Sequence, residues 1–183
     1  MKSTIVSFFL FIHGAVSSCT LITNQELRDH VDLWISSPTN HPCGDVIGDW
    51  DVSRVTDMSN VFESKTTFNA DLSGWDTSSV TTLQSTFHDA QAYNANISSW
   101  NTASVTTLEN TFYGASAFNG DISRWNTSSN GWLHRTFRDA IAFNANISGW
   151  DTSSVMDLRE AFYGASSFNR DISNWDVRNV ESL

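Results

Sequence analysis

The sequence predicts an α/β fold, a leucine-rich-repeat-like solenoid in which each 25-residue unit contributes one short parallel strand and one helix. The first observation behind this prediction is a fixed period, because tryptophan recurs at positions 50, 75, 100, 125, 150 and 175. The second is a helical spacing of apolar residues inside each unit, and the third is an amphipathic segment ahead of the first unit. A period of this length is typical of solenoids, in which each unit buries its apolar face against its neighbours.

The helix of each unit is predicted from four apolar positions. In one unit, Val105, Leu108, Phe112 and Ala115 follow one another at spacings of three, four and three residues. This spacing places them on one face of a helix over about residues 104–114.

The strand of each unit is predicted at the short, β-compatible stretch 121–124, which would pair with the same stretch one unit away. An all-β helix is the alternative architecture, but its turns would not need the three-four-three spacing.

One asparagine stands at the same place in every unit, and an amide can bridge backbone groups of adjacent turns. We expect these residues to form a structural ladder: Asn69, Asn94, Asn119, Asn144 and Asn169.

Two places further on, carboxylates and amides alternate in the order Asp71, Asn96, Asp121, Asn146 and Asp171. Stacked strands lie about 4.8 Å apart, so an unbroken aspartate column would repel itself. We interpret the alternation as relief of that repulsion, with hydrogen bonds between turns. A calcium-binding repeat is the rival hypothesis, but calcium needs six to eight oxygen ligands and successive carboxylates are two turns apart.

Three domains follow from this pattern. Residues 1–18, with Lys2 ahead of the apolar run 5–12, predict a secretory signal peptide, and the run is too short for the roughly 20 residues of a membrane span. Residues 19–45 predict an N-terminal capping helix and linker, because a solenoid exposes its first core layer unless something covers it. Residues 46–183 predict the repeat solenoid, about five and a half units that stop within a unit.

Cys19 allows two interpretations. Val16-Ser-Ser-Cys19 is similar to a bacterial lipobox, which would make Cys19 a lipid anchor. Alternatively, Cys19 pairs with Cys43 in a disulfide, as an oxidising compartment permits, or both cysteines remain free thiols.

Charge and composition exclude several classes of function. The net charge of −10 and the lack of any basic cluster argue against a nucleic-acid partner, since phosphates would be repelled. No nucleophile with a base, no paired-carboxylate cleft and no phosphate-binding loop is visible, so we expect no enzyme and no cofactor. His30 and His41 have no further ligands at a useful spacing, so we expect no metal site.

One unit departs from its siblings and supplies the candidate partner contact. It reads Asn130-Gly131-Trp132 where the two units before it read Val-Thr-Thr, and the basic residues His134, Arg135 and Arg138 follow, which makes this the least acidic surface. Trp132 is either an exposed aromatic platform, for instance for a sugar, or a filler of the hole left by the missing valine.

Three asparagines begin Asn-x-Ser sequons, the acceptor sequence for N-linked glycans: Asn96, Asn126 and Asn146. Asn96 and Asn146 fall in the proposed alternating column, where we expect them to be poorly accessible.

The elements Trp-Asp-x-Ser-x-Val-Thr-x-Met/Leu, Phe-x-x-Ala-x-x-Phe-Asn and Asp-Ile-Ser-x-Trp resemble the repeat of BspA-type surface proteins over about residues 46–183. Val46–Asn60 carries the closest stretch. The resemblance implies an extracellular, secreted or surface-displayed chain that recognises a protein or a glycan at a cell surface. The alternatives are a structural surface component without a specific ligand and a calcium-binding repeat protein.

Overall fold

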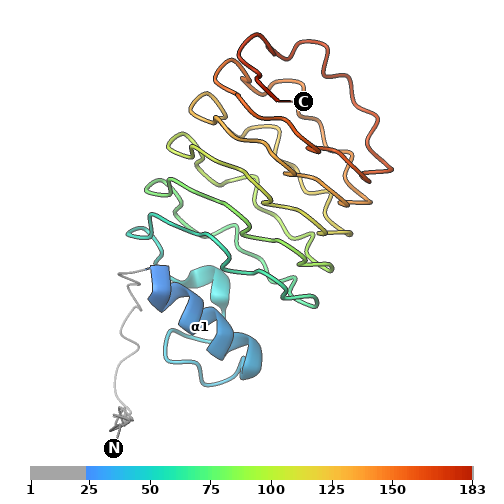
Figure 1. Ribbon diagram of the computed structural model, residues 1–183. Coiled ribbons are helices and arrows are strands. Elements are labelled where there is room, and N and C mark those ends of the chain that lie inside the picture. Colours follow the sequence, from blue (N-terminus) through green and yellow to red (C-terminus); the bar gives the residue numbers. More distant parts are fainter. Residues whose placement is uncertain (1–23, 183) are drawn as a thin grey trace, which may run out of the picture.

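A computed structural model describes residues 24–182, which form a stack of coils with one helix at its N-terminal end (Figure 1). The helix is α1 (Asn24–Ser36), and a single 3-10 turn, η1 (Ile47–Asp49), precedes the coils. The predicted signal peptide 1–18 and Cys19 lie outside the described residues. Among residues 24–182, no helix has the length and apolar content to cross a membrane.

Helix α1 lies against the first coil and is fixed to it by packing and polar bonds. Leu27 and Val31 are fully buried. The Asn24 side-chain oxygen accepts the backbone N–H of Asp57 at 3.0 Å, and Arg28 Nε donates to the Ser59 carbonyl oxygen at 2.8 Å. The amphipathic segment therefore covers the N-terminal end of the core.

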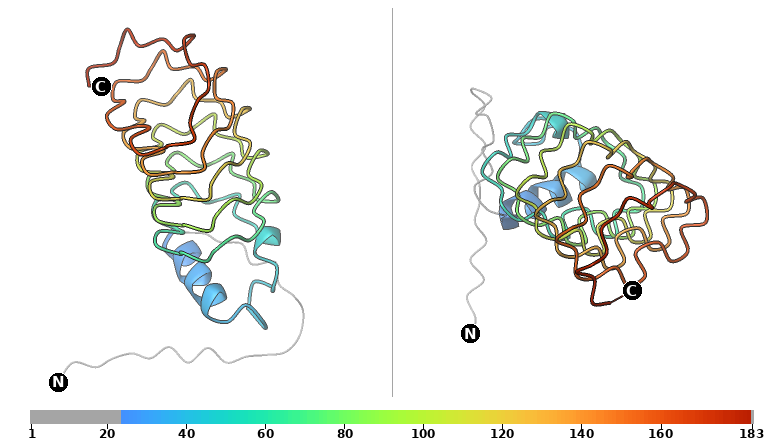
Figure 2. Two further views of the ribbon diagram at one scale, coloured as in Figure 1. Left: turned by 90° about the vertical axis from the view of Figure 1, so that its right-hand side faces the viewer. Right: turned by 90° about the horizontal axis from the view of Figure 1, so that it is seen from above.

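The coils stack in register, one turn for every 25 residues. Figure 2 shows them one above another from the side and superposed around a common centre from above. Isolated parallel bridges join equivalent residues of successive coils: Asp57 to Thr82, Thr82 to Thr107, Thr107 to Trp132, Trp132 to Asp157, and Asp157 to Ser182.

The predicted α/β fold is wrong. Over residues 24–182 the only α-helix is α1, and β-structure is limited to isolated bridges without a sheet. Each unit is a coil of consecutive turns, so the protein is not a leucine-rich-repeat-like solenoid of strands and helices.

The helix expected at residues 104–114 is absent because some of its N–H groups bond to the next coil and others bond within their own coil. Asn110 and Gly114 have left-handed backbones, with φ of 53° and 67°. The N–H groups of Leu108, Asn110, Phe112 and Gly114 donate to carbonyl oxygens of the next coil, while those of Thr111 and Tyr113 donate to the carbonyl oxygen three residues earlier in their own coil. The result is a run of tight turns.

These turns still return apolar side chains to the core every three or four residues, as a helix does. Val105, Leu108, Phe112 and Ala115 are each at most 2% exposed. The apolar spacing therefore identified the buried positions correctly but could not distinguish a helix from a series of turns.

The strand expected at 121–124 is absent for a related reason. This stretch contains a turn, closed by a bond from the Trp125 N–H to the Ile122 carbonyl oxygen at 3.1 Å. Neighbouring coils are joined here by tryptophan side chains: Trp125 Nε1 donates to the Ile97 carbonyl oxygen at 3.2 Å. An indole N–H thus provides the link that a backbone ladder would have provided.

The core consists of aromatic columns that run along the stack. Phe112 stacks on Phe87 and Phe137 in the adjacent coils, with ring centroids 5.6 and 5.7 Å apart, and on Phe118 of its own coil at 3.9 Å. The tryptophans form a second column with centroid spacings of 6.3 to 6.5 Å. Each inner coil therefore buries its rings between the rings of its two neighbours.

The asparagine ladder is present on the surface of the stack. The Oδ1 atom of Asn69 accepts the backbone N–H of Asn94 at 2.8 Å, and the same bond recurs at Asn94, Asn119 and Asn144. These side chains are exposed except for the half-buried Asn144, so the ladder holds adjacent coils in register from outside the core.

Candidate functional site

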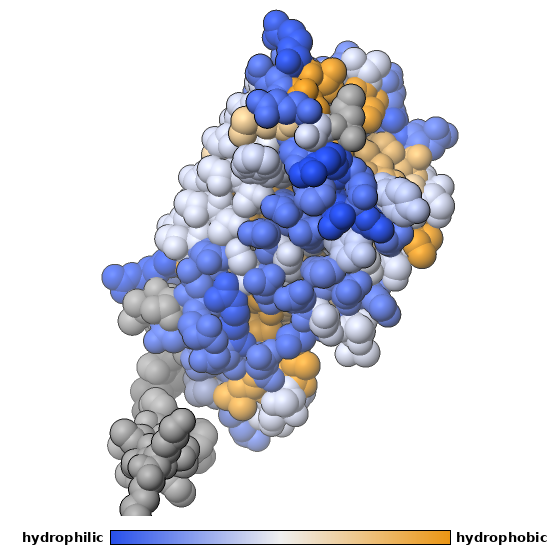
Figure 3. Space-filling model, viewed as in Figure 1, coloured by the Kyte–Doolittle hydropathy of each residue, from blue (hydrophilic) through white to orange (hydrophobic). Residues whose placement is uncertain are grey.

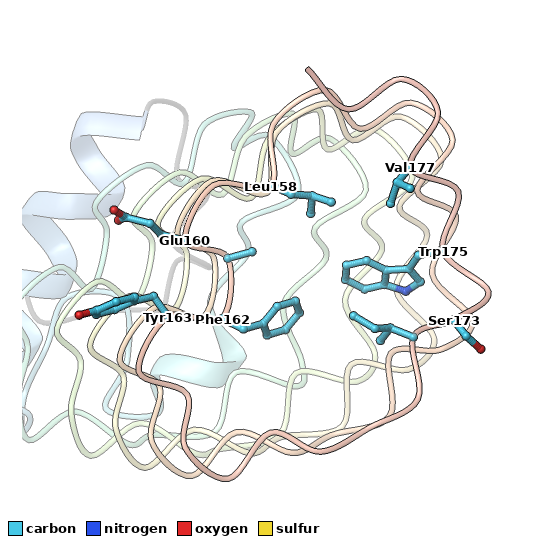
Figure 4. A pocket seen from close by; sticks show the side chains of 9 residues that line it. Leu158, Glu160, Phe162, Tyr163, Ser173, Trp175 and Val177 are labelled. Carbon is cyan, nitrogen blue, oxygen red and sulfur yellow. The ribbon is translucent and has the colours of Figure 1, made fainter. Parts of the chain in front are cut away.

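A hollow at the C-terminal end of the stack has a volume of about 550 Å³. Figure 4 shows Leu158, Phe162 and Trp175 facing its interior. These residues occupy the places that a following coil covers elsewhere in the stack. The hollow is therefore the uncovered core layer of the final coil among residues 24–182, and the described residues that line it bring no convergent set of polar groups into it.

A second cluster, near α1, adds Cys43 to His30 and His41, the two histidines for which the sequence offered no further ligand. His30, His41 and Cys43 place their ligand atoms within 4.8 Å of one another, and no other such group of three His, Cys, Asp or Glu residues occurs in residues 24–182. Cys43, however, is disulfide-bonded and so has no thiolate to donate. The two imidazoles that remain do not make a metal site.

His41 is buried for structural reasons. Its ring stacks on Trp50 with centroids 4.8 Å apart, and its Nδ1 accepts the Cys43 N–H at 3.1 Å. Burial, and after it the neighbouring His30, lowers the pKa of His41. A neutral ring packed on an indole is part of the covered N-terminal end of the core.

In the unit that departs from the repeat, the structure shows how Asn130, Gly131 and Trp132 are accommodated. Asn130 is 1% exposed in the place of a core valine, and its Oδ1 accepts the Trp132 N–H at 3.0 Å, while its buried Nδ2 has no partner within residues 24–182. Gly131 leaves room for the Met156 side chain. Trp132 itself is 44% exposed, so the interpretation in which it fills the hole left by valine is wrong.

The structure connects the two predicted arginines through a residue that was not predicted. Glu160, in the next coil, accepts a bond from Arg135 Nε at 2.6 Å and another from Arg138 Nη1. The bond from Arg135, followed by that from Arg138, lowers the pKa of the Glu160 carboxyl. Arg135 and Arg138 are thereby held on one surface.

Two tyrosines enclose Arg138 and were also missed. The Arg138 guanidinium lies 4.8 Å from the Tyr163 ring centroid and 5.5 Å from that of Tyr113, distances at which cation–π attraction operates. Tyr163 is 63% exposed. The signal that could have found them is the variable place directly after the core phenylalanine, which is filled by Glu63, His88, Tyr113, Arg138 and Tyr163.

The fourth predicted residue, His134, lies at the edge of this group, where its Nδ1 is 3.4 Å from Glu109 Oε1. We use the name Trp132–Tyr163 surface for the exposed side chains of Trp132, Glu160 and Tyr163 together with the half-buried Arg135 and Arg138. Figure 4 shows Glu160 and Tyr163 directed outward on the same side of the coil. On the face shown in Figure 3 most of the surface is hydrophilic, and apolar side chains gather toward the two ends of the stack.

The alternating column has a different role from the one expected. The Oδ1 atoms of Asp71 and Asn96 accept the N–H of the serine two residues later, at 2.9 and 3.0 Å, and the other members do the same. These bonds lie within each coil and do not join turns. Aspartate and asparagine are therefore equivalent as turn-forming residues at this place.

Acid should destabilise the fold through these turns. The serine N–H bonds lower the carboxyl pKa of Asp71 and Asp171, and the bonds from Arg178 lower that of Asp176 to about 2. A carboxyl pKa depressed by folding contributes stability above the ordinary value of 3.8, and that contribution is lost as the pH falls toward 2. We therefore expect the urea midpoint to be constant from pH 7 to about 5 and to fall below pH 4.

A matched control comes from the repeat itself. Replacing Asp71, Asp121 and Asp171 by asparagine keeps the turn, as Asn96 and Asn146 do, but removes three titrating groups. This variant should unfold at the same urea concentration as the parent at pH 7 and at a higher concentration at pH 2.5. An identical loss in both proteins below pH 4 would show that these turns do not carry the acid sensitivity.

The chain is similar to a known protein family. A family described as "Mycoplasma protein of unknown function, DUF285" matches residues 37–132 and 131–183. The chain belongs to this family. The DUF285 match begins directly after α1 and runs through the coils, so the stacked coil is the part of the chain that the family shares. No curated protein matches the chain, and no solved structure matches it.

Proposed function

We propose that this DUF285 protein is a non-catalytic, extracellular recognition scaffold that binds a protein or a glycan through the Trp132–Tyr163 surface. The BspA-type resemblance of its repeats supports an extracellular role. The single observation that carries the proposal is the buried amide nitrogen of Asn130, unpaired within residues 24–182, in the coil that exposes Trp132.

The cost of this amide is visible when the coil is compared with its siblings. Val80, Val105 and Val155 fill the core place that Asn130 fills here, each at most 2% exposed. A buried amide nitrogen without a partner costs about 1–3 kcal/mol. Departures from regular packing occur chiefly at functional or strained sites. In this coil the departure at Asn130 is accompanied by an exposed tryptophan, Trp132.

The composition of the surface also fits recognition. Tryptophan, tyrosine and arginine are the residues most enriched among binding hot spots. Trp132 and Tyr163 are 44% and 63% exposed, and Arg135 and Arg138 are held by Glu160. A surface of fixed aromatic and cationic groups loses little conformational entropy on binding.

The test uses the fluorescently labelled full chain on intact cells and on an immobilised glycan array. Trp132→Ala combined with Tyr163→Ala should lower binding at least tenfold, since each hot-spot residue contributes on the order of 2 kcal/mol or more. Val177→Ala is the matched control, because Val177 is 50% exposed and Figure 4 shows it across the core from Tyr163. Equal binding by the parent and the double variant would contradict the proposal.

The same experiment distinguishes the ligand classes. Loss of binding after protease treatment of the cells, with no signal on the array, indicates a protein ligand. Retention after protease together with an array signal indicates a glycan. Absence of specific binding to cells and array alike would instead favour a structural surface component without a ligand.

A further inference from the structure

We propose that Asn96, Asn126 and Asn146 are acceptors for N-linked glycans, and that these glycans cover the side of the stack opposite the Trp132–Tyr163 surface. The three asparagines begin the Asn-x-Ser sequons of the chain. A sequon alone is a weak signal, so the inference depends on how the structure presents them.

All three side chains are exposed and share one geometry. Asn96 Oδ1 accepts both the N–H and the Oγ–H of Ser98, at 3.0 and 2.8 Å. Asn126 with Ser128 and Asn146 with Ser148 repeat both bonds, at 3.1 and 2.8 Å in each pair. The expectation that the alternating column makes its asparagines poorly accessible is therefore wrong.

This geometry leaves the reacting atom free. The carbonyl oxygen of each amide is occupied by the serine, and no bond within residues 24–182 engages Nδ2 of these three asparagines. In the transfer, Nδ2 attacks the anomeric carbon of a lipid-diphosphate-linked oligosaccharide. The C–N bond forms as the bond from that carbon to the phosphate oxygen breaks, the lipid diphosphate leaves with the electron pair, and the amide loses one proton.

The coil geometry sets where the glycans would lie. Asn96 and Asn146 occupy the same place in coils two turns apart, and Asn126, directly after Trp125, is the second residue of the 25-residue unit that contains Asn146. In the last coil, Ser173 holds the place of Ser98 and Val177 holds that of Thr127. Figure 4 shows Ser173 and Val177 across the core from Glu160 and Tyr163. Glycans at the three sites would therefore leave the Trp132–Tyr163 surface uncovered.

The chain contains a natural control at Asn101. Its Oδ1 accepts the Ala103 N–H at 3.1 Å, which is the same turn, but Ala103 has no hydroxyl. Asn101-Thr-Ala is therefore not a sequon, and Ala103→Ser would convert it into one by adding a single oxygen atom.

The experiment is expression of the full chain with its own N-terminal residues in a eukaryotic secretory cell. Electrophoresis before and after peptide N-glycosidase, and mass spectrometry for the conversion of glycosylated asparagine to aspartate in heavy-oxygen water, give the readout. We expect glycans at Asn96, Asn126 and Asn146 and none at Asn101. Ser98→Ala should remove one glycan, and Ala103→Ser should add one.

The outcomes decide the proposal directly. A chain without glycosidase-sensitive modification, whether it is secreted or retained, overturns it. Modification at Asn101 of the parent, or no gain in Ala103→Ser, overturns the role given to the serine hydroxyl. Because the proposed glycans lie away from the Trp132–Tyr163 surface, the folded protein should bind cells equally well after glycosidase treatment, and a large loss would contradict that placement.

Discussion

Replacing Phe112 by alanine is expected to destabilise the protein by about 3–5 kcal/mol, the usual cost of removing a buried phenylalanine ring. Phe112 is fully buried, and its ring stacks on Phe87, Phe137 and Phe118. The alanine would leave a gap in the column, because the rings above and below are fixed by coils whose spacing is set by backbone hydrogen bonds. Equilibrium unfolding in guanidinium, followed by tryptophan fluorescence, measures the change.

Tyr163→Ala is the matched control for that variant. Tyr163 follows the equivalent core phenylalanine directly but is 63% exposed, so its loss should change stability by less than about 0.5 kcal/mol. A loss below about 1 kcal/mol in Phe112→Ala would mean that the aromatic column is not a continuous, closely packed core.

Replacing Gly114 by alanine is expected to cost at least about 1–2 kcal/mol, the penalty for an L-residue in left-handed geometry. The φ of Gly114 is 67°, and an added Cβ would lie 2.1 Å from Asp89 Oδ1 in the preceding coil. That distance is far below van der Waals contact, so the aspartate side chain must move. The unfolding free energy in guanidinium again gives the readout.

Two further variants separate strain from steric contact. Gly149→Ala is the neutral control, because φ there is not in the left-handed region and nothing lies within 4 Å of the added Cβ. In Gly114→Ala, the additional change Asp89→Ala removes the contact and should restore part of the loss. If Gly114→Ala and Gly149→Ala were equally stable, the left-handed turn at this place would be contradicted.

Much of the coil was predictable because the 25-residue period shows which residues occupy equivalent positions in successive units. The buried set followed from the apolar spacing, and the asparagine ladder followed from an amide that recurs in every unit. Coil geometry was not predictable from the same spacing, since tight turns and helices both return a side chain to the core every three or four residues. The left-handed places were concealed because Asn110, Ser85 and Arg135 can all occupy them.

The candidate site was predicted in part. Trp132 stood out as a departure from the repeat, Arg135 and Arg138 were chosen as basic residues near it, and the structure brings the two arginines together. Glu160 and Tyr163 were missed because their importance arises from stacking one coil on the next, which places residues 25 positions apart in contact. Cys43 was missed as a neighbour of His30 and His41 for a different reason, because α1 folds back onto the loop that follows it.

The central claim is that residues 104–114 and their equivalents are turns shared between coils and not helices. Backbone NMR of the isotopically labelled full chain tests it most directly, through Cα shifts and the couplings that report φ. The coil predicts left-handed couplings at Asn110 and a slowly exchanging Asn110 amide that bonds to the His134 carbonyl oxygen of the next coil at 3.0 Å. Continuous helical shifts from 104 to 114, repeated in every unit, would contradict the account.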